Sequence, residues 1–454
     1  MTNDPYTLQA YREGDLVGWL RYNPEEDVFR FDYAPDWKDK RHAFQLSPHI
    51  PFDGPAPAVT VRRFIQNLLP EGEALDVAAV YNQVSKSNDF GLLRALGGET
   101  AGALRFLAAP QPPQEPVRRR ISFEELSQRI AERDRQPFIV WDGKVRISVA
   151  GYQDKLQVIR EGNDIYLADG SLSSTHILKP PSRNPLLPHM VANEHFCMSL
   201  ASALGSSKKH FEPWAAQVDI LRVPDPVLCV TRFDRRLDGD VVRSFHILDG
   251  CQALDRPVSH KYERNIGSGE DVKHIRDGVS FEALAALRAG DHLANAAVDL
   301  RQMARWAITT LLIGNSDAHA KNLSFFAQYR SLAVAPFYDL VCTAVYDGNR
   351  VEQDLAMAFG DEFQLDAVRA FALADFCERL GYPRAAFARE LRTACIHARR
   401  AADELAAHPI YVDDERAFVR QLADFIIARA DALQGFAADI PKFAADNFAD
   451  PQTA

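Results

Sequence analysis

The sequence predicts an α+β fold in which a sheet-rich part precedes a helix-rich part. Three observations support this fold class. Most of the short strands that the sequence predicts, separated by turn residues, lie within positions 1–235. From Phe281 onward, apolar residues recur with helical spacing instead. A polar loop at residues 314–322 lies at the head of this helical part, between a long apolar-periodic run and a short apolar strand.

The bulk properties exclude several classes of protein. At 454 residues the chain is long enough for two or three domains. Its net charge of −10 argues against broad non-specific nucleic-acid binding, which needs clustered Lys and Arg. The six cysteines are scattered, and the N-terminus lacks both the basic and the apolar region of a signal peptide. No run of about 18 apolar residues exists, so we expect no membrane contact. The scattered cysteines favour reduced thiols, and we expect a cytoplasmic protein.

Residues 1–108 are expected to form a small α/β subdomain. Its elements are a hairpin over residues 6–21, a strand at 28–33, helices at 59–69 and 89–96, and a strand at 101–107. Pro70 and Gly72 are expected to end the first of these helices. Prolines are then frequent between residues 108 and 116, which predicts a linker that we place at residues 109–121.

Residues 122–235 are expected to form a second, sheet-rich domain. The capping box Ser122-Phe123-Glu124-Glu125 predicts a helix at its start. A helix is expected at 190–204, and strands at 138–141, 145–149, 155–160, 165–168, 175–179, 216–223 and 227–233. Residues 236–454 are expected to be mostly helical, with an exposed loop at 256–273.

The loop at residues 314–322 carries the densest group of reactive side chains. Gly314 follows the last residue of the apolar-periodic run and is expected to end that helix. Asp317 and Asn322 then stand in the order Asp-x-x-x-x-Asn, which is the spacing of the catalytic loop in protein kinases. The alternative is a polar turn in which both side chains cap backbone groups.

Other residues supply what phosphoryl transfer needs besides this loop. Lys179 ends an apolar strand, from which an ammonium group can reach phosphates, and Glu194 on the next helix can pair with it. Asp339 lies among apolar residues, where an ionised carboxylate needs a cation or donors. A G-x-G-x-x-G motif is absent, and the nearest phosphate-covering candidate is the turn at residues 145–155. A sheet-rich part followed by a helical part with this loop is the layout of a bilobal kinase.

Further motifs accompany these residues in the same order along the chain. They are Asn67-Leu68-Leu69-Pro70, residues 147–155, Thr175-His176-Ile177-Leu178-Lys179, Asn193-Glu194, Arg232-Phe233-Asp234-Arg235, Cys251-Gln252-Ala253-Leu254, residues 314–322 and Tyr338-Asp339-Leu340. With them, the chain resembles the HipA family of toxin serine/threonine kinases from bacterial toxin–antitoxin modules over most of its length. The resemblance implies a bilobal protein-kinase-like fold, with residues 122–235 as the ATP-binding N-lobe and 236–454 as the C-lobe.

The resemblance also implies roles for individual residues. Asp317, Asn322 and Lys179 would be catalytic, and Asn322 and Asp339 would hold Mg²⁺. Ser148 would be an autophosphorylation site in the phosphate-covering loop. The residues that would contact ATP are Val149, Ala150, Gly151, Lys155, Lys179, Thr231, Arg232, Phe233, Gln252, His319, Asn322 and Asp339. Tyr152 and Asp154 stand where the family pattern favours a small residue and Glu.

The resemblance implies partners as well. A small helix-turn-helix, HipB-like antitoxin would bind the chain and supply most contacts to operator DNA. The phosphorylated protein would be a translation component such as an aminoacyl-tRNA synthetase, with growth arrest and persistence as the result.

Two alternatives from other classes stay open. Asp317, His319 and Asp339 could form the metal site of a hydrolase, which would turn over without ATP. The chain could also be a catalytically impaired module that acts as an antitoxin-binding transcriptional corepressor. A thermal-shift response to Mg·ATP would separate a nucleotide binder from such a scaffold.

Overall fold

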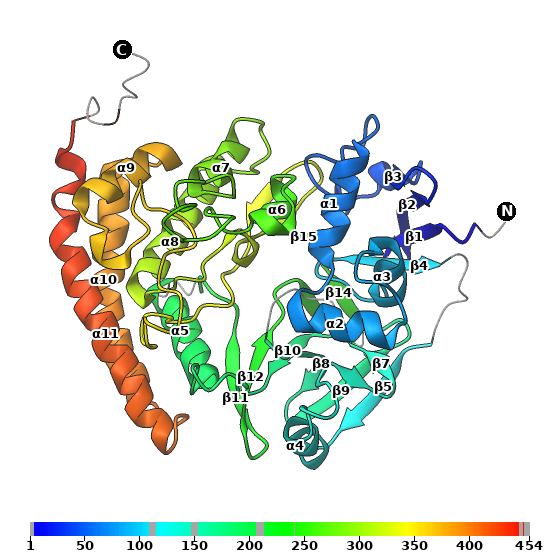
Figure 1. Ribbon diagram of the computed structural model, residues 1–454, viewed down its shortest axis with the longest axis horizontal. Helices are drawn as coiled ribbons and strands as arrows, with labels where there is room; N and C mark the ends of the chain where they lie inside the picture. The colour runs from blue at the N-terminus through cyan, green and yellow to red at the C-terminus, as the bar shows by residue number, and fades with distance from the viewer. Residues whose placement is uncertain are drawn as a thin grey trace. The chain divides into compact units, whose positions relative to one another are not determined.

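The computed structural model describes residues 4–108, 115–146, 153–205, 213–239, 241–444 and 448. The chain divides into two compact units. Unit 1 contains residues 1–182, 219–258 and 324–335, and unit 2 contains residues 183–218, 259–323 and 336–454. The described part of unit 1 is built mainly on β-sheets, whereas that of unit 2 is mostly helical, as the sequence pattern predicts (Figure 1).

The N-terminal part of unit 1 is a four-stranded antiparallel sheet in the order β3-β2-β1-β4. Its strands are β1 (Thr7–Arg12), β2 (Asp15–Asn23), β3 (Val28–Tyr33) and β4 (Leu104–Ala108). Alternate residues of these strands are buried, among them Leu8, Ala10, Phe29 and Phe31, and helix α1 (Ala58–Leu68) packs on β3. This unit therefore has the half-buried strands that an alternating pattern produces.

Two further helices of this region are α2 (Gly72–Tyr81) and α3 (Asp89–Leu96). The sequence interpretation predicts α3 but misses α2, because Pro70 and Gly72 stand where a helix would end. In the structure Gly72 has φ 56° and is the first residue of α2. The same glycine that closes one helical pattern thus allows the sharp turn into the next helix.

A six-stranded sheet forms the second part of unit 1, in the order β11-β12-β10-β8-β9-β5. The strands are β5 (Val117–Ile121), β8 (Leu156–Glu161), β9 (Asp164–Asp169), β10 (His176–Lys179), β11 (Val218–Arg222) and β12 (Pro226–Thr231). Helix α4 (Phe123–Ala131), capped by Ser122, contributes Leu126 and Ile130 to the apolar cluster formed with these strands. Strand β5 lies within residues 109–121, which the sequence assigns to a linker, and it pairs in register with β9.

The remaining strands of unit 1 are short. They are β6 (Val140–Trp141), β7 (Lys144–Val145), β13 (Arg235–Asp238), β14 (Val241–Ser244), β15 (Ile247–Asp249), β16 (Ser324–Ala327) and β17 (Leu332–Val334). Strands β15, β16 and β17 form a three-stranded antiparallel sheet, and helix α6 (Gly250–Ala253) follows β15. Short 3₁₀ helices occur in both units, at Trp37–Asp39, Val258–His260, Ala286–Arg288, Ala320–Asn322, Leu365–Ala367 and Ile440–Lys442.

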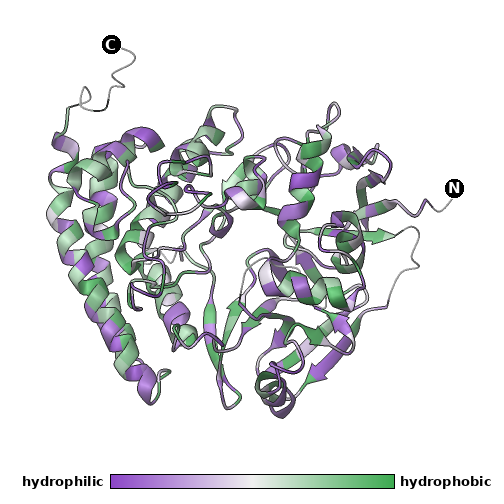
Figure 2. Ribbon diagram, viewed as in Figure 1, coloured by the Kyte–Doolittle hydropathy of each residue, from purple (hydrophilic) through white to green (hydrophobic). Residues whose placement is uncertain are grey.

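Unit 2 is built on α5 (Met190–Gly205), α7 (Phe281–Ala285), α8 (Ala296–Ile313), α9 (Ala370–Leu380), α10 (Arg384–Ala406) and α11 (Asp414–Ala437). The long helices α10 and α11 pack side by side (Figure 1, orange and red). Hydrophilic and hydrophobic residues alternate along both helices, which is the pattern of helices that bury one face (Figure 2). No helix among the described residues is long and apolar enough to cross a membrane.

One expectation about unit 2 is met only in part. The sequence predicts that residues 256–273 form an exposed loop, but Lys261 and Glu263 within this segment are buried. The backbone of Glu263 pairs with Ala356 and Gly278, so the segment is fastened to residues far along the chain. A polar sequence gives no sign of such long-range pairing, because the buried polar groups find partners only in the folded chain.

Candidate active site

The polar loop after α8 begins with a left-handed turn. Helix α8 ends at Gly314, as the sequence predicts, and this glycine has φ 64° and ψ 49°. A Cβ atom at this glycine would lie 2.8 Å from Cβ of Ala344 and 2.9 Å from the ring of Phe425. The position therefore requires glycine for its conformation and for the space around it. The turn sends the chain abruptly out of the helix and into the loop.

The loop backbone is fastened to a neighbouring segment of unit 2. The amide of Ser316 donates to Oγ1 of Thr343 at 2.7 Å, and the hydroxyl of Ser316 donates to the carbonyl of Glu352 at 2.8 Å. The amide of Asp317 donates to Oδ1 of Asn315 at 3.0 Å. These bonds fix the backbone while the carboxylate of Asp317 remains exposed. A rigid loop that presents one exposed carboxylate is suited to orient a reacting group.

The structure brings Asp317 and Asn322 together. Asn322 is buried, and its Nδ2 donates to the carbonyl of Asp317 at 3.0 Å. This bond orients the carboxamide so that its oxygen points away from that carbonyl. On the other side, the phenol of Tyr262 donates to Oδ1 of Asp317 at 2.5 Å. The loop thus offers a carboxylate and an amide oxygen, which are oxygen ligands of the kind that Mg²⁺ prefers.

His319 is a neutral, buried residue of the loop. Burial, reinforced by the charge of Lys261, lowers the pKa of His319 to about 3, so the imidazole is uncharged near neutral pH. Its ring lies edge-on to Tyr262 with centroids 5.0 Å apart. Within the part of the chain that the structure describes, no three His, Cys, Asp or Glu side chains are arranged to hold a metal ion. Asp317, His319 and Asp339 therefore do not assemble the metal site of the hydrolase alternative.

Asp339 is connected to the loop at residues 314–322 by a hydrogen bond of its neighbour Tyr338. It is half-buried and has φ 56°, a left-handed conformation that non-glycine residues adopt at a cost. Phe337 before it is buried and its amide donates to the carbonyl of Trp214 at 2.7 Å. The phenol of Tyr338 donates to the carbonyl of Lys321 at 2.5 Å. Asp339 thus follows a residue that is bonded directly to the Asp317–Asn322 loop.

The predicted phosphate-binding lysines lie on adjacent strands of unit 1. Lys179 ends β10 and Lys155 immediately precedes β8, and both side chains are buried. Leu178 and Leu156 are cross-strand partners, so the two lysines fall one position beyond that antiparallel pair. The two positive side chains thus belong to directly opposed positions of neighbouring strands, and their contact with phosphates stays a prediction. Their position is consistent with a phosphate site on this sheet.

Arg232 and Gln252 are occupied with structural contacts inside unit 1. The guanidinium of Arg232 bonds to both carboxylate oxygens of Asp234, at 2.9 and 2.7 Å, and to Glu99 at 3.2 Å. Gln252 completes a capping box with Asp249 at the start of α6, and its Nε2 donates to the carbonyl of Phe64 at 3.2 Å. Both side chains have structural partners, and their contact with a nucleotide stays a prediction.

The contacts of the other predicted site residues do not indicate a specific role. Thr231 pairs with His176 across β12 and β10, and the ring of Phe233 lies edge-on to that of Phe326 with centroids 5.8 Å apart. Glu194 is buried in α5, and its pairing with Lys179 stays a prediction. Ser148, Val149, Ala150 and Gly151 lie outside the described residues.

Sequence reasoning misses one residue of this site, Tyr262. The tyrosine lies in the segment predicted to be an exposed loop, yet it bonds directly to Asp317. The only local signal is an aromatic residue between Lys261 and Glu263 in an otherwise polar stretch. That signal is too weak to separate a site residue from a surface tyrosine.

Comparisons with known proteins agree with this geometry. A model of the HipA-like C-terminal domain matches residues 147–409, and a model of the HipA N-terminal domain matches residues 8–107. The serine/threonine-protein kinase toxin HipA of Shewanella oneidensis is 40% identical over 439 residues, which are 96% of this chain and 97% of that protein. The putative kinase Y4mE of Sinorhizobium fredii is 31% identical over 384 residues, or 82% of this chain and 86% of that protein.

A solved structure gives the same result. In the Shewanella oneidensis MR-1 complex of HipA, HipB and operator DNA, one chain superposes with a TM-score of 0.85 and 38% identity. The match covers 96% of this chain and 100% of that chain. These similarities do not favour the non-catalytic corepressor alternative. The chain therefore belongs to the HipA family and is an enzyme of the serine/threonine-protein kinase class.

Proposed function

We propose that this chain is the kinase toxin of a type II toxin–antitoxin module, and that it transfers the γ-phosphate of Mg·ATP to a serine or threonine of a cellular protein. The observation that carries the proposal is the rigid loop in which Asn322 bonds to Asp317 while the Asp317 carboxylate stays exposed. This is the pair whose spacing matches the catalytic loop of protein kinases. Its geometry suits a residue that must meet an incoming hydroxyl.

Asp317 orients the substrate hydroxyl in this proposal. Because an ordinary aspartate has a pKa of about 3.9, such a group is a weak base, and alignment of the hydroxyl with late acceptance of its proton is its main contribution. Asn322 and Asp339 would hold Mg²⁺, and the bound ion would offset charge on the phosphates. Both residues offer the hard oxygen atoms that this ion takes.

The nucleotide is held by residues of the sheet in unit 1. Lys179, together with Lys155, supplies positive charge to the phosphates. Thr231, Arg232 and Phe233 would face the adenine, and Gln252 and the neutral ring of His319 would contact the nucleotide. In this assignment residues 122–235 act as the N-lobe of a bilobal, protein-kinase-like fold and residues 236–454 act as its C-lobe, with residues 1–108 as an additional α/β subdomain and 109–121 as the connection.

Ser148 is the proposed autophosphorylation site. A phosphoserine adds a charge of about −1.5 to −2, which within residues 145–155 would repel the phosphates of ATP. Phosphorylation of Ser148 would then switch the enzyme off. The four residues 148–151 would cover the phosphates in the active, unmodified form.

A HipB-like helix-turn-helix antitoxin is the proposed partner. The chain carries a net charge of −10, so the antitoxin would supply most contacts to operator DNA. The complex of the Shewanella relative with HipB and operator DNA supports this assembly. The proposed substrate is a translation component, such as an aminoacyl-tRNA synthetase, in the cytoplasm, and its phosphorylation would cause growth arrest and persistence.

Quantitative phosphoproteomics tests the proposal and identifies the substrate. Cells that express the chain are compared with cells that express the Asp317→Asn variant at equal abundance. We expect one or a few serine or threonine sites to gain phosphate only with the unmodified chain, together with arrest of growth. Equal phosphoproteomes, or arrest by both chains, would contradict the proposed activity.

A further inference from the structure

We propose that Tyr262 is a positioning residue for the Asp317 carboxylate, an inference that rests on the proposed function. Its phenol donates to Oδ1 of Asp317 at 2.5 Å, a length typical of a hydroxyl bonded to an ionised carboxylate. A carboxylate that accepts this bond cannot rotate freely. The bond therefore restricts the direction in which the carboxylate can meet a substrate hydroxyl.

The backbone on both sides of Tyr262 is fastened. The carbonyl of Lys261 accepts from the amide of Ala320, within the catalytic loop itself, at 3.0 Å. The amide of Glu263 donates to the carbonyl of Ala356 at 2.9 Å. Tyr262 thus lies between two anchored residues, one tied to the loop that it supports and one tied to the body of unit 2. A side chain placed in this way can hold a partner in one geometry.

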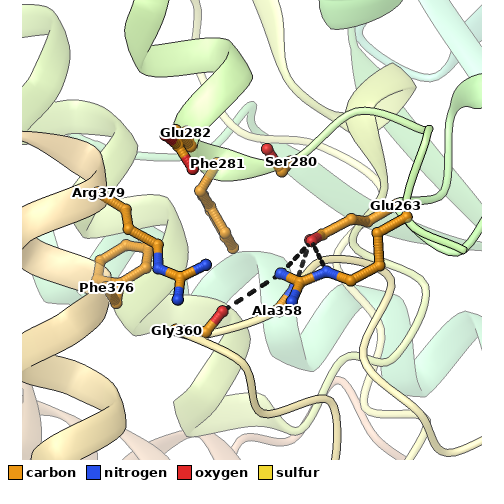
Figure 3. A pocket seen from close by; sticks show the side chains of 9 residues that line it. Glu263, Ser280, Phe281, Glu282, Ala358, Gly360, Phe376 and Arg379 are labelled. Carbon is orange, nitrogen blue, oxygen red and sulfur yellow. Dashed lines mark hydrogen bonds and ion pairs between the residues drawn. The ribbon is translucent and has the colours of Figure 1, made fainter. Parts of the chain in front are cut away.

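The second anchor is strengthened by a buried carboxylate. Glu263 is 2% exposed; its carboxylate accepts from the amide of Ala358 at 2.8 Å and from Nε of Arg276 at 2.7 Å. Glu263 and Phe281 line a small cavity of about 210 Å³. Figure 3 shows both side chains. Arg276 is partly exposed, so the ion pair adds little stability by itself, but its hydrogen bonds restrict the position of the buried Glu263. The pair therefore supports the position of Tyr262.

The ring of Tyr262 is also held from the loop side. The imidazole of His319, two residues after Asp317, meets it edge-on with an interplanar angle of 89°. The ammonium group of Lys261 lies 5.5 Å from the centroid of the same ring. A tyrosine that is held by its backbone, its ring and its hydroxyl is suited to positioning. If the phenol instead occupied the place of the substrate hydroxyl, it would have to move away during turnover.

The Tyr262→Phe variant tests the inference, with γ-labelled Mg·ATP as the probe and label transferred to protein as the signal. Hydrogen bonds to charged groups correspond to a loss of about 10- to 100-fold, so we expect the maximal rate to fall by that factor. The concentration of Mg·ATP at half the maximal rate is expected to stay unchanged. The acid limb of the pH–rate profile is expected to move to higher pH, because the ionised carboxylate loses a donor.

Tyr411→Phe is the matched control. Tyr411 is fully buried, and its phenol bonds to Nδ1 of His195 at 2.8 Å, so its removal also deletes one oxygen and one hydrogen bond in unit 2. This variant is expected to keep the wild-type rate and pH profile. If Tyr262→Phe does not fold, site-specific 3-fluorotyrosine at position 262 replaces it. The more acidic phenol is a stronger donor, and the acid limb is then expected to move to lower pH.

The outcomes separate the two proposals. A wild-type chain that transfers no label contradicts the proposed function. An active wild-type chain with an equally active Tyr262→Phe variant, or a pH profile that 3-fluorotyrosine leaves unchanged, overturns the positioning role alone. A faster Tyr262→Phe variant also overturns it, because the phenol would then compete with the substrate for Asp317.

Discussion

Asp317 in unit 2 and Asp234 in unit 1 are two carboxylates in very different surroundings. Asp317 is exposed, and its Oδ1 accepts a hydrogen bond from the phenol of Tyr262. Asp234 is 4% exposed and accepts from the guanidinium groups of Arg232 and Arg235. Burial alone would oppose ionisation of Asp234, but the two arginine charges outweigh it and hold its pKa at about 2.

The different surroundings of these two carboxylates correspond to a structural role for Asp234 and a proposed chemical role for Asp317. The oxygens of Asp234 are saturated by charged donors and by the amide of Gly102 at 2.9 Å, so this residue holds the chain together. Asp317 has a rigid backbone and an accessible carboxylate, so it can act on a substrate. Both residues belong to polar motifs, and their surroundings rather than their residue type distinguish them.

The largest expected effect comes from the same isosteric change at each carboxylate. Asp234→Asn leaves buried arginine charge uncompensated and is expected to reduce the apparent free energy of unfolding by about 3–5 kcal/mol. Asp317→Asn is expected to change it by less than about 0.5 kcal/mol, because the site is exposed and the amide oxygen can still accept from Tyr262. Urea unfolding followed by circular dichroism measures both. Equal destabilisation by the two variants would contradict the assignment of a structural role to Asp234 alone.

Acidification is expected to have a smaller effect on the free energy of unfolding. As the pH falls, buried histidines contribute to this effect at a higher pH than Asp234 does. His246 is buried against Phe44, and burial lowers its pKa to about 4. Below an unfolded-state pKa of about 6.5 the unfolded chain binds a proton that folded His246 does not. The free energy of unfolding should therefore fall as the pH drops from about 6.5 to about 4, by up to about 1.4 kcal/mol per pH unit for this residue.

Variants of two histidines isolate this contribution. His246→Gln is expected to make the decline between pH 6.5 and 4 shallower, whereas the same change at the exposed His274 should leave it as it is. Asp234 titrates later: its folded-state pKa is depressed from 3.8 to about 2, so its contribution persists above pH 4 and is lost only below it. A pH dependence that His246→Gln does not alter would contradict the assignment of a neutral buried imidazole.

Much of the fold follows from local patterns in the sequence. The turn residues between β1 and β2, the alternation in β3 and the apolar face of α8 lead directly to the observed elements, and Gly314 ends α8 as predicted. The spacing of Asp317 and Asn322 is also local, so their proximity could be predicted. Such features depend on a few neighbouring residues, which is why they can be read without the structure.

The remaining features depend on contacts between distant residues. The pairing of β5 with β9 cannot be read from a proline-rich segment, and the burial of Glu263 depends on Ala358 and on Arg276. The bond between Tyr262 and Asp317 joins residues 55 positions apart. A single sequence contains no local sign of these contacts, so the support of the loop at residues 314–322 becomes visible only in the folded chain.

Phosphoamino-acid analysis after label transfer is the most direct test of the central claim. The purified chain is incubated with γ-labelled Mg·ATP and a bacterial extract, and the labelled protein is hydrolysed. We predict phosphoserine or phosphothreonine with the wild-type chain, and a rate lower by about 10²- to 10⁴-fold with Asp317→Asn, although that variant should still show a thermal shift with Mg·ATP. Label that appears equally with both chains, or with neither, would contradict the account.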